Sequence, residues 1–181
     1  MAISKTQIIS LIKKMGFSKN DGVINIYSKK YCHHNNYEIK INFDEEKIIY
    51  STGRSDESIQ VLGNFSTNFS KDENFVVLEC INRLLECGYK PSSIEIEKSW
   101  PSGHDTSGRL DILVRKINRD PYIMIECKTW GAEYDKEKII CYKQRRLAMK
   151  NNQKVNYFRI IGRRKKLNIL YCMLLELLIT V

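Results

Sequence analysis

Two stretches of the sequence are decisive for its interpretation: Gly108-Arg-Leu-Asp-Ile-Leu-Val114 and, after a turn, Tyr122-Ile-Met-Ile-Glu-Cys-Lys128. Both are short and apolar, and the residues between them include Asn, Asp and Pro, so they predict two adjacent β-strands. Because side chains alternate between the faces of a strand, Glu126 and Lys128 share one face and Cys127 lies on the core face. Asp111 takes a strand position whose neighbours are all apolar.

A carboxylate at the position of Asp111 needs a partner, because desolvating it costs roughly several kcal/mol unless another charge compensates. Mg²⁺ compensates well, since it prefers carboxylate and carbonyl oxygens with water. Asp111 and Glu126 could therefore hold Mg²⁺ and activate water for phosphodiester hydrolysis. Lys128 could position or deprotonate that water, or stabilise charge on the phosphate. The alternative is a surface hairpin on which Glu126 and Lys128 form an ordinary ion pair.

The surrounding sequence predicts an α/β fold. Residues 72–87 carry a broad apolar stripe at helical spacing and end at Gly88, which predicts the strongest helix of the chain. Residues 93–97 alternate as a strand before the two decisive stretches. Towards the N-terminus, residues 6–15 predict a short helix and residues 37–50 a β-hairpin, while residues 51–71 are polar and turn-rich, which predicts an irregular connection.

Together, residues 73–89, 94–98, 108–114 and 123–129 resemble the PD-(D/E)XK nuclease superfamily. The resemblance is to the N-terminal nuclease domain of restriction–modification proteins, of the type I restriction-subunit and the fused nuclease–methyltransferase kinds. It implies a restriction-endonuclease-like core, a central mixed β-sheet flanked by helices, and Mg²⁺-dependent cleavage of double-stranded DNA. Methyltransferase and specificity subunits or domains would be further partners.

By match to the family motif, Asp111 and Glu126 are implied as metal ligands and Lys128 as the catalytic lysine. The backbone carbonyl of Cys127 is implied as a further ligand. Leu110 stands where the family usually has proline, a tolerated departure.

Many relatives add a glutamate from the first helix. Here Glu73 is preferred to Glu79, because it lies at the edge of the apolar stripe. Ser70-x-x-Glu73 also fits a capping box, which would explain Glu73 equally well.

The charge of the chain divides it into three parts. Residues 139–181 hold ten Lys or Arg against a single acid, Glu176, and therefore account for the whole net charge of +9. We expect a small N-terminal α+β extension at 1–68, the nuclease core at 69–138, and a basic then apolar tail at 139–181. Charge alone therefore does not predict DNA binding for the core.

The tail departs from the family after about Lys138, where a helix with Gln-x-x-x-Tyr and a final apolar strand are expected. One explanation is a basic DNA-binding arm. The other is a frameshift that truncates the domain, in which case the sheet would lack its last strand. The nucleotides of the gene would distinguish the two.

Other function classes are disfavoured. No apolar run has the length of a membrane span or the form of a signal peptide, and the six cysteines have no zinc-site spacing. We therefore expect a cytoplasmic protein with reduced thiols, and we interpret Cys32-His33-His34 as a solvated loop rather than a metal site. The leading hypothesis is an Mg²⁺-dependent DNA endonuclease domain, and the alternative is a catalytically inactive DNA-binding remnant of one.

Overall fold

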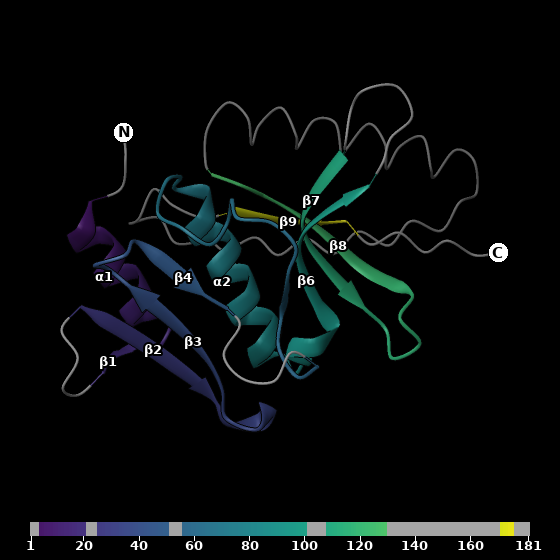
Figure 1. Ribbon diagram of the computed structural model, residues 1–181, viewed down its shortest axis with the longest axis horizontal. Coiled ribbons are helices and arrows are strands. Elements are labelled where there is room, and N and C mark those ends of the chain that lie inside the picture. Colours follow the sequence, from purple (N-terminus) through teal and green to yellow (C-terminus); the bar gives the residue numbers. More distant parts are fainter. Residues whose placement is uncertain (1–3, 21–24, 51–55, 101–107, 130–170, 176–181) are drawn as a thin grey trace.

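The computed structural model describes residues 4–20, 25–50, 56–100, 108–129 and 171–175, which form two β-sheets with a helix between them (Figure 1). The first sheet has the strand order β1-β2-β3-β4 and the second β5-β6-β7-β8-β9. This is a mixed α/β architecture, as the sequence predicts. Within these residues no helix is both long and apolar enough to cross a membrane.

The first sheet is antiparallel and packs with helix α1. Its elements are α1 (Lys5–Lys14), β1 (Ser18–Lys19), β2 (Ile26–Tyr31), the 3-10 turn η1 (Cys32–His34), β3 (Tyr37–Asn42) and β4 (Lys47–Ile49). Ser4 and Gln7 cap α1 with reciprocal hydrogen bonds. On β3, Ile39 and Ile41 alternate with polar residues and are fully buried, so one face of the sheet forms core. The predicted helix at 6–15 and hairpin at 37–50 are confirmed.

The second sheet is mixed, as expected. Its strands are β5 (Gln60–Val61), β6 (Ile94–Trp100), β7 (Gly108–Arg115), β8 (Pro121–Lys128) and β9 (Tyr171–Leu175), and the 3-10 turn η2 (Pro91–Ser93) precedes β6. β5 runs parallel to β6, whereas the other neighbours are antiparallel. Ile112 of β7 lies opposite Ile125 of β8, and both are fully buried. The two decisive stretches are therefore adjacent central strands.

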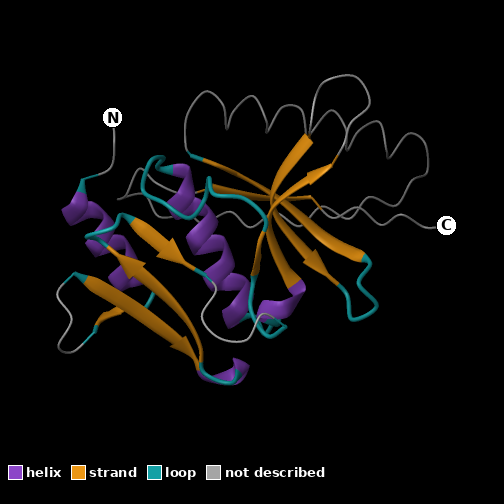
Figure 2. Ribbon diagram, viewed as in Figure 1, coloured by secondary structure: helices purple, strands orange, loops and turns teal. Residues whose placement is uncertain are grey.

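Helix α2 (Glu73–Glu86) lies between the two sheets, with strands on either side of it (Figure 2). Four consecutive residues, Phe75 to Leu78, are buried. Successive helical residues are about 100° apart, so core surrounds this turn on all sides. Asn82, also buried, accepts hydrogen bonds from Tyr31 and Lys29 of β2. The helix thus belongs to both layers.

Two expectations need correction. Asp72, not Ser70, is the N-cap of α2, and it makes no side-chain cap; the Ser70 hydroxyl instead donates to Asn68 at 2.5 Å, so no Ser70–Glu73 capping box forms. The predicted irregular connection at 51–71 contains β5, so residues 60–61 join the second sheet although they fall in the 1–68 segment. In the tail, β9 pairs antiparallel with β8 in the second sheet.

Candidate active site

The candidate site forms where β7 and β8 pass the first turn of α2. Along β8 the residues alternate between buried and half-buried, with Ile125 and Cys127 on the core face and Glu126 and Lys128 on the other. This is the alternation expected from the sequence. Asp111 lies on β7, one residue before Ile112, whose partner on β8 is Ile125. The two strands therefore bring Asp111 and Glu126 to the same level of the sheet.

Asp111 is the buried member of the site, with only 5% of its surface exposed. Its carboxylate accepts a hydrogen bond from the backbone N–H of Cys127 at 2.7 Å, which fixes its orientation across the β7–β8 pair. Burial raises the pKa of Asp111 to about 6, and the neighbouring charge of Glu126 adds to the effect. The Cys127 N–H and Lys128 oppose that shift without cancelling it. A carboxylate in this position favours a bound proton or a nearby cation.

Lys128 joins the acids of the site. Its Nζ lies 2.5 Å from Glu126 Oε1 and 3.4 Å from Glu73 Oε1. Burial alone would lower the pKa of Lys128, but its hydrogen bond to Glu126 and the charges of Glu126, Glu73 and Asp111 outweigh burial and raise it. The lysine is therefore held as a cation between carboxylates from two different elements.

The structure places Glu73, rather than Glu79, at this site. Glu73 is the first residue of α2 and contacts Lys128. Glu79 lies further along the helix and pairs with Arg83 four residues later. Since no capping box holds Glu73, its contact in the structure is the one with Lys128, and all four predicted side chains, Asp111, Glu126, Lys128 and Glu73, come together.

The donor groups suit Mg²⁺. The carboxylates of Asp111 and Glu126 are close enough that the charge of Glu126 raises the pKa of Asp111. A cation bound between them would relieve the repulsion of the two negative charges. The N–H and C=O of one strand residue point to the same side, so the Cys127 carbonyl is directed towards β7 like its N–H. Within the described residues, no three His, Cys, Asp or Glu side chains already converge as a ligand set, and Glu126 and Glu73 are turned to Lys128 instead.

Glu97 is a buried acid that sequence reasoning missed. The β6–β7 register places it across from Asp111, but the backbone at Glu97 has φ of +61° and the pairing skips both residues. Its side chain is 1% exposed, accepts a hydrogen bond from the Ser66 N–H, and has no hydrogen-bond partner for Oε2 among the described residues. The alternation of Ile and Glu in β6 predicts a solvent-facing Glu97, and no local signal marks the distortion.

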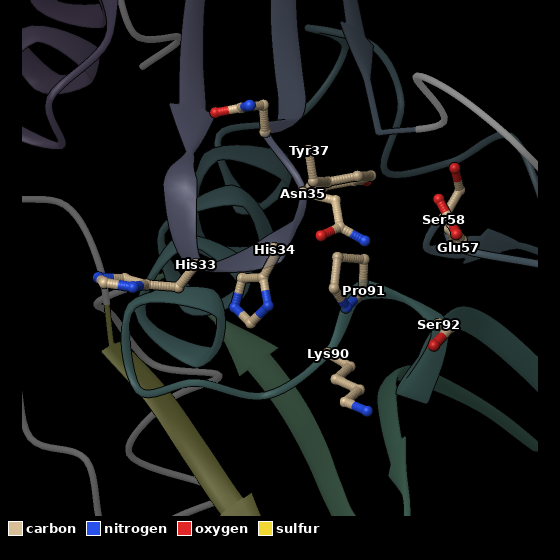
Figure 3. Close-up of a pocket in the computed structure, with 10 residues that line it drawn as sticks. His33, His34, Asn35, Tyr37, Glu57, Ser58, Lys90, Pro91 and Ser92 are labelled. Carbon is tan, nitrogen blue, oxygen red and sulfur yellow. The ribbon is translucent and has the colours of Figure 1, made fainter.

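A second polar feature lies at the other end of α2. A pocket of about 570 Å³ is lined by residues that include His33, His34, Ser58 and Lys90 (Figure 3). His34 Nε2 is 2.9 Å from the Leu85 carbonyl, near the C-terminus of the helix. Glu73 is at the N-terminus, and a helix of 14 residues is about 20 Å long, so the pocket is separate from Asp111.

Comparisons with models of protein families, with curated proteins and with solved structures give no match. The candidate site is thus defined by its own geometry. It places the buried Asp111 beside Glu126, and it holds the Lys128 ammonium group between Glu126 and Glu73.

Proposed function

We propose that this chain is an Mg²⁺-dependent DNA endonuclease of the restriction–modification type, which hydrolyses phosphodiester bonds at Asp111, Glu126 and Lys128. The observation that carries the proposal is the meeting of Lys128 with Glu126 and Glu73 beside the buried Asp111. Three of these residues come from two adjacent central strands, and the fourth comes from a helix more than thirty residues earlier in the chain. A chance surface ion pair would not require a buried acid from a neighbouring strand.

Each residue has a role that follows from its position. Asp111, Glu126 and the Cys127 carbonyl would hold Mg²⁺, which when bound polarises a phosphoryl oxygen and lowers the pKa of water. Asp111 is oriented by the Cys127 N–H, so its free oxygen keeps one direction. Lys128 presents its ammonium group to a non-bridging phosphate oxygen or to the attacking water, where a fixed cation stabilises developing negative charge.

Glu73 acts as a positioning residue. Its carboxylate lies 3.4 Å from Lys128 Nζ, which is close enough for attraction. Glu126 lies nearer to the same Nζ, at 2.5 Å, and holds it more tightly. When Glu126 turns to a cation, Glu73 remains as the partner that keeps the lysine at the site. Double-stranded DNA is the proposed substrate, and methyltransferase and specificity subunits or domains are proposed further partners.

Cleavage of plasmid DNA by the full chain tests the proposal. The parent should cut with Mg²⁺ and not with EDTA. Asp111→Asn and Lys128→Met should each lower the cleavage rate by at least about a hundredfold, because each removes a group that acts on the reacting phosphate. The matched control is Glu79→Gln, another α2 glutamate that pairs with Arg83 away from the site, and it should cut like the parent. Thermal melts would show that each variant is folded.

The outcomes separate the alternatives. DNA binding without cleavage by the parent, in Mg²⁺ and in EDTA alike, would mean that the chain is an inactive DNA-binding remnant. Cleavage that survives Asp111→Asn would show that another site does the chemistry. A parent that neither binds nor cuts DNA would refute both.

A further inference from the structure

An exposed aromatic ring lies near the candidate site. Among the described residues three large hydrophobic side chains are exposed: Leu62 at 49%, Phe65 at 57% and Ile117 completely. Phe65 differs from the other two because a cation accompanies it. The guanidinium carbon of Arg109, itself exposed, lies 4.5 Å from the centre of the Phe65 ring, which is a cation–π contact.

The segment that carries Phe65 is held by two buried polar side chains. Asn74, 4% exposed, donates to the Phe65 carbonyl at 2.7 Å and to the Asn68 carbonyl at 2.9 Å. Glu97 accepts from the Ser66 N–H, one residue after Phe65. Burying such groups is costly unless they are satisfied, so the peptide bond that follows Phe65 is anchored through both its carbonyl and its N–H. Phe65 is presented to solvent from a fixed position.

Both anchors belong to elements of the candidate site. Asn74 follows Glu73 on α2, and Glu97 lies across from Asp111 in the β6–β7 register. Arg109 precedes Asp111 by two residues on β7, so their side chains leave the same face of the strand. The Phe65–Arg109 pair therefore lies at the margin of the site and shares its supports.

The Phe65 ring and the Arg109 guanidinium together indicate what kind of ligand would bind them. An exposed ring beside an exposed guanidinium complements a molecule that carries both negative charge and flat unsaturated faces. Unpaired DNA offers both, since its phosphates attract arginine and its bases stack on aromatic side chains. Bases inside a duplex are already stacked on one another and present only their edges.

We propose that Phe65, with Arg109 beside it, is a stacking contact for an unpaired base of the DNA strand that enters the Asp111 site. The contact rests on the proposed nuclease function and specifies its substrate. It makes the site prefer DNA with a single-stranded segment next to the cleaved bond over fully paired DNA.

Binding of the full chain to fluorescently labelled DNA tests this contact, with anisotropy as the measurement and Ca²⁺ in place of Mg²⁺ to prevent cleavage. The probes are a duplex with a single-stranded tail and the same duplex fully paired. Phe65→Ala should weaken binding to the tailed duplex about tenfold and to the paired duplex less than about twofold. Phe65→Trp should restore tight binding. Ile117→Ala, the loss of a hydrophobic side chain in the β7–β8 turn, is the matched control and should change neither affinity.

Two results would overturn the stacking contact: Phe65→Ala behaving like Ile117→Ala on the tailed duplex, or an equal loss on both DNAs. Whether the parent cleaves DNA distinguishes a failure of the stacking contact from a failure of the proposed function. A parent that cuts with Mg²⁺ while Phe65→Ala binds normally refutes the contact alone, whereas a parent that neither binds nor cuts either DNA refutes both.

Discussion

The two sheets of the molecule bury different kinds of side chain. In the strands of the first sheet the buried positions are apolar or tyrosine, and Ser28 is the polar exception among the described residues. The described strands of the second sheet bury three acids: Glu95, Glu97 and Asp111. Glu95 is compensated by Arg115, but Asp111 faces another acid, and Glu97 Oε2 has no hydrogen-bond partner in the part of the chain that the structure describes. The buried side chains of the first sheet stabilise the fold. The second sheet bears the desolvation cost of buried carboxylates, which a need for stability does not explain.

Ile41→Ala is expected to have the largest effect, because it removes a fully buried side chain from the first sheet. The free energy of unfolding should fall by about 4 kcal/mol, the usual cost of lost burial plus a cavity. Urea denaturation measures it, and the loss should be the same at pH 4 and pH 7. A loss below about 1 kcal/mol would mean that this sheet is not the stabilising layer.

Asp111→Asn should stabilise the chain in EDTA. The pKa of Asp111 is raised to about 6 from an ordinary 3.8, so between these values the folded chain binds a proton that the unfolded chain has released. The contribution of Asp111 to stability therefore falls as pH rises from about 4 to about 6, and the full cost, on the order of 3 kcal/mol, remains above pH 6. Asp111→Asn should add about that much at pH 7 and almost nothing at pH 4. An equal effect at pH 4 and pH 7 would show that burying the charged form of Asp111 does not destabilise the second sheet.

Gly63→Ala tests the packing around Glu97 in the second sheet. A Cβ at Gly63 would overlap Glu97 Oε2, and overpacking of this kind costs about 2 kcal/mol. Glu97→Asp shortens the side chain, so the double variant should recover much of the loss in a mutant cycle. Gly88→Ala is the control, because φ at Gly88 is +91° with open space around it, and Glu97→Asp should leave its cost of about 1 kcal/mol unchanged. Additive losses at Gly63 and Glu97 would show that the two do not touch.

The smallest expected effect on the free energy of unfolding concerns Lys29, which connects the first sheet to α2. Lys29 Nζ donates to the Met15 carbonyl at 2.6 Å, to Asn82 at 2.7 Å and to Glu86 at 2.5 Å. Lys29→Met should lower the free energy of unfolding by about 1 kcal/mol, since Glu86 is half exposed and returns to water easily. Lys47→Met, which breaks an exposed pair with Glu45, should cause no measurable change in urea denaturation. A larger loss at Lys47 than at Lys29 would contradict this order.

The sequence predicts those parts of the structure that repeat a pattern over many residues. α2 and the β7–β8 pair were predictable because the apolar periodicity of each is long and regular. β5 has two residues and exists through its pairing with β6, which no local pattern encodes. β2, Ile26-Tyr-Ser-Lys-Lys-Tyr31, has too weak an alternation to predict a strand by itself. β9 was missed because its partner lies more than forty residues earlier in the chain.

The candidate site was partly predictable for the same reason. Asp111, Glu126 and Lys128 lie on one hairpin, so strand alternation and a turn suffice to bring them together. The approach of Glu73 to Lys128 depends on how α2 packs on β8, and the sequence left its two explanations equal. The left-handed backbone at Glu97 and its contact with Ser66 are tertiary effects without a local signature.

Because core surrounds the Phe75–Leu78 turn of α2 on all sides, we expect the two sheets to unfold as one cooperative unit. Neither layer can open without exposing part of the Phe75–Leu78 turn to water, so heat or urea should reveal a single transition rather than two. We therefore expect the residues before β5 to help to keep Glu73 in place. A chain shortened to begin at β5 should lose the order of the candidate site along with its fold.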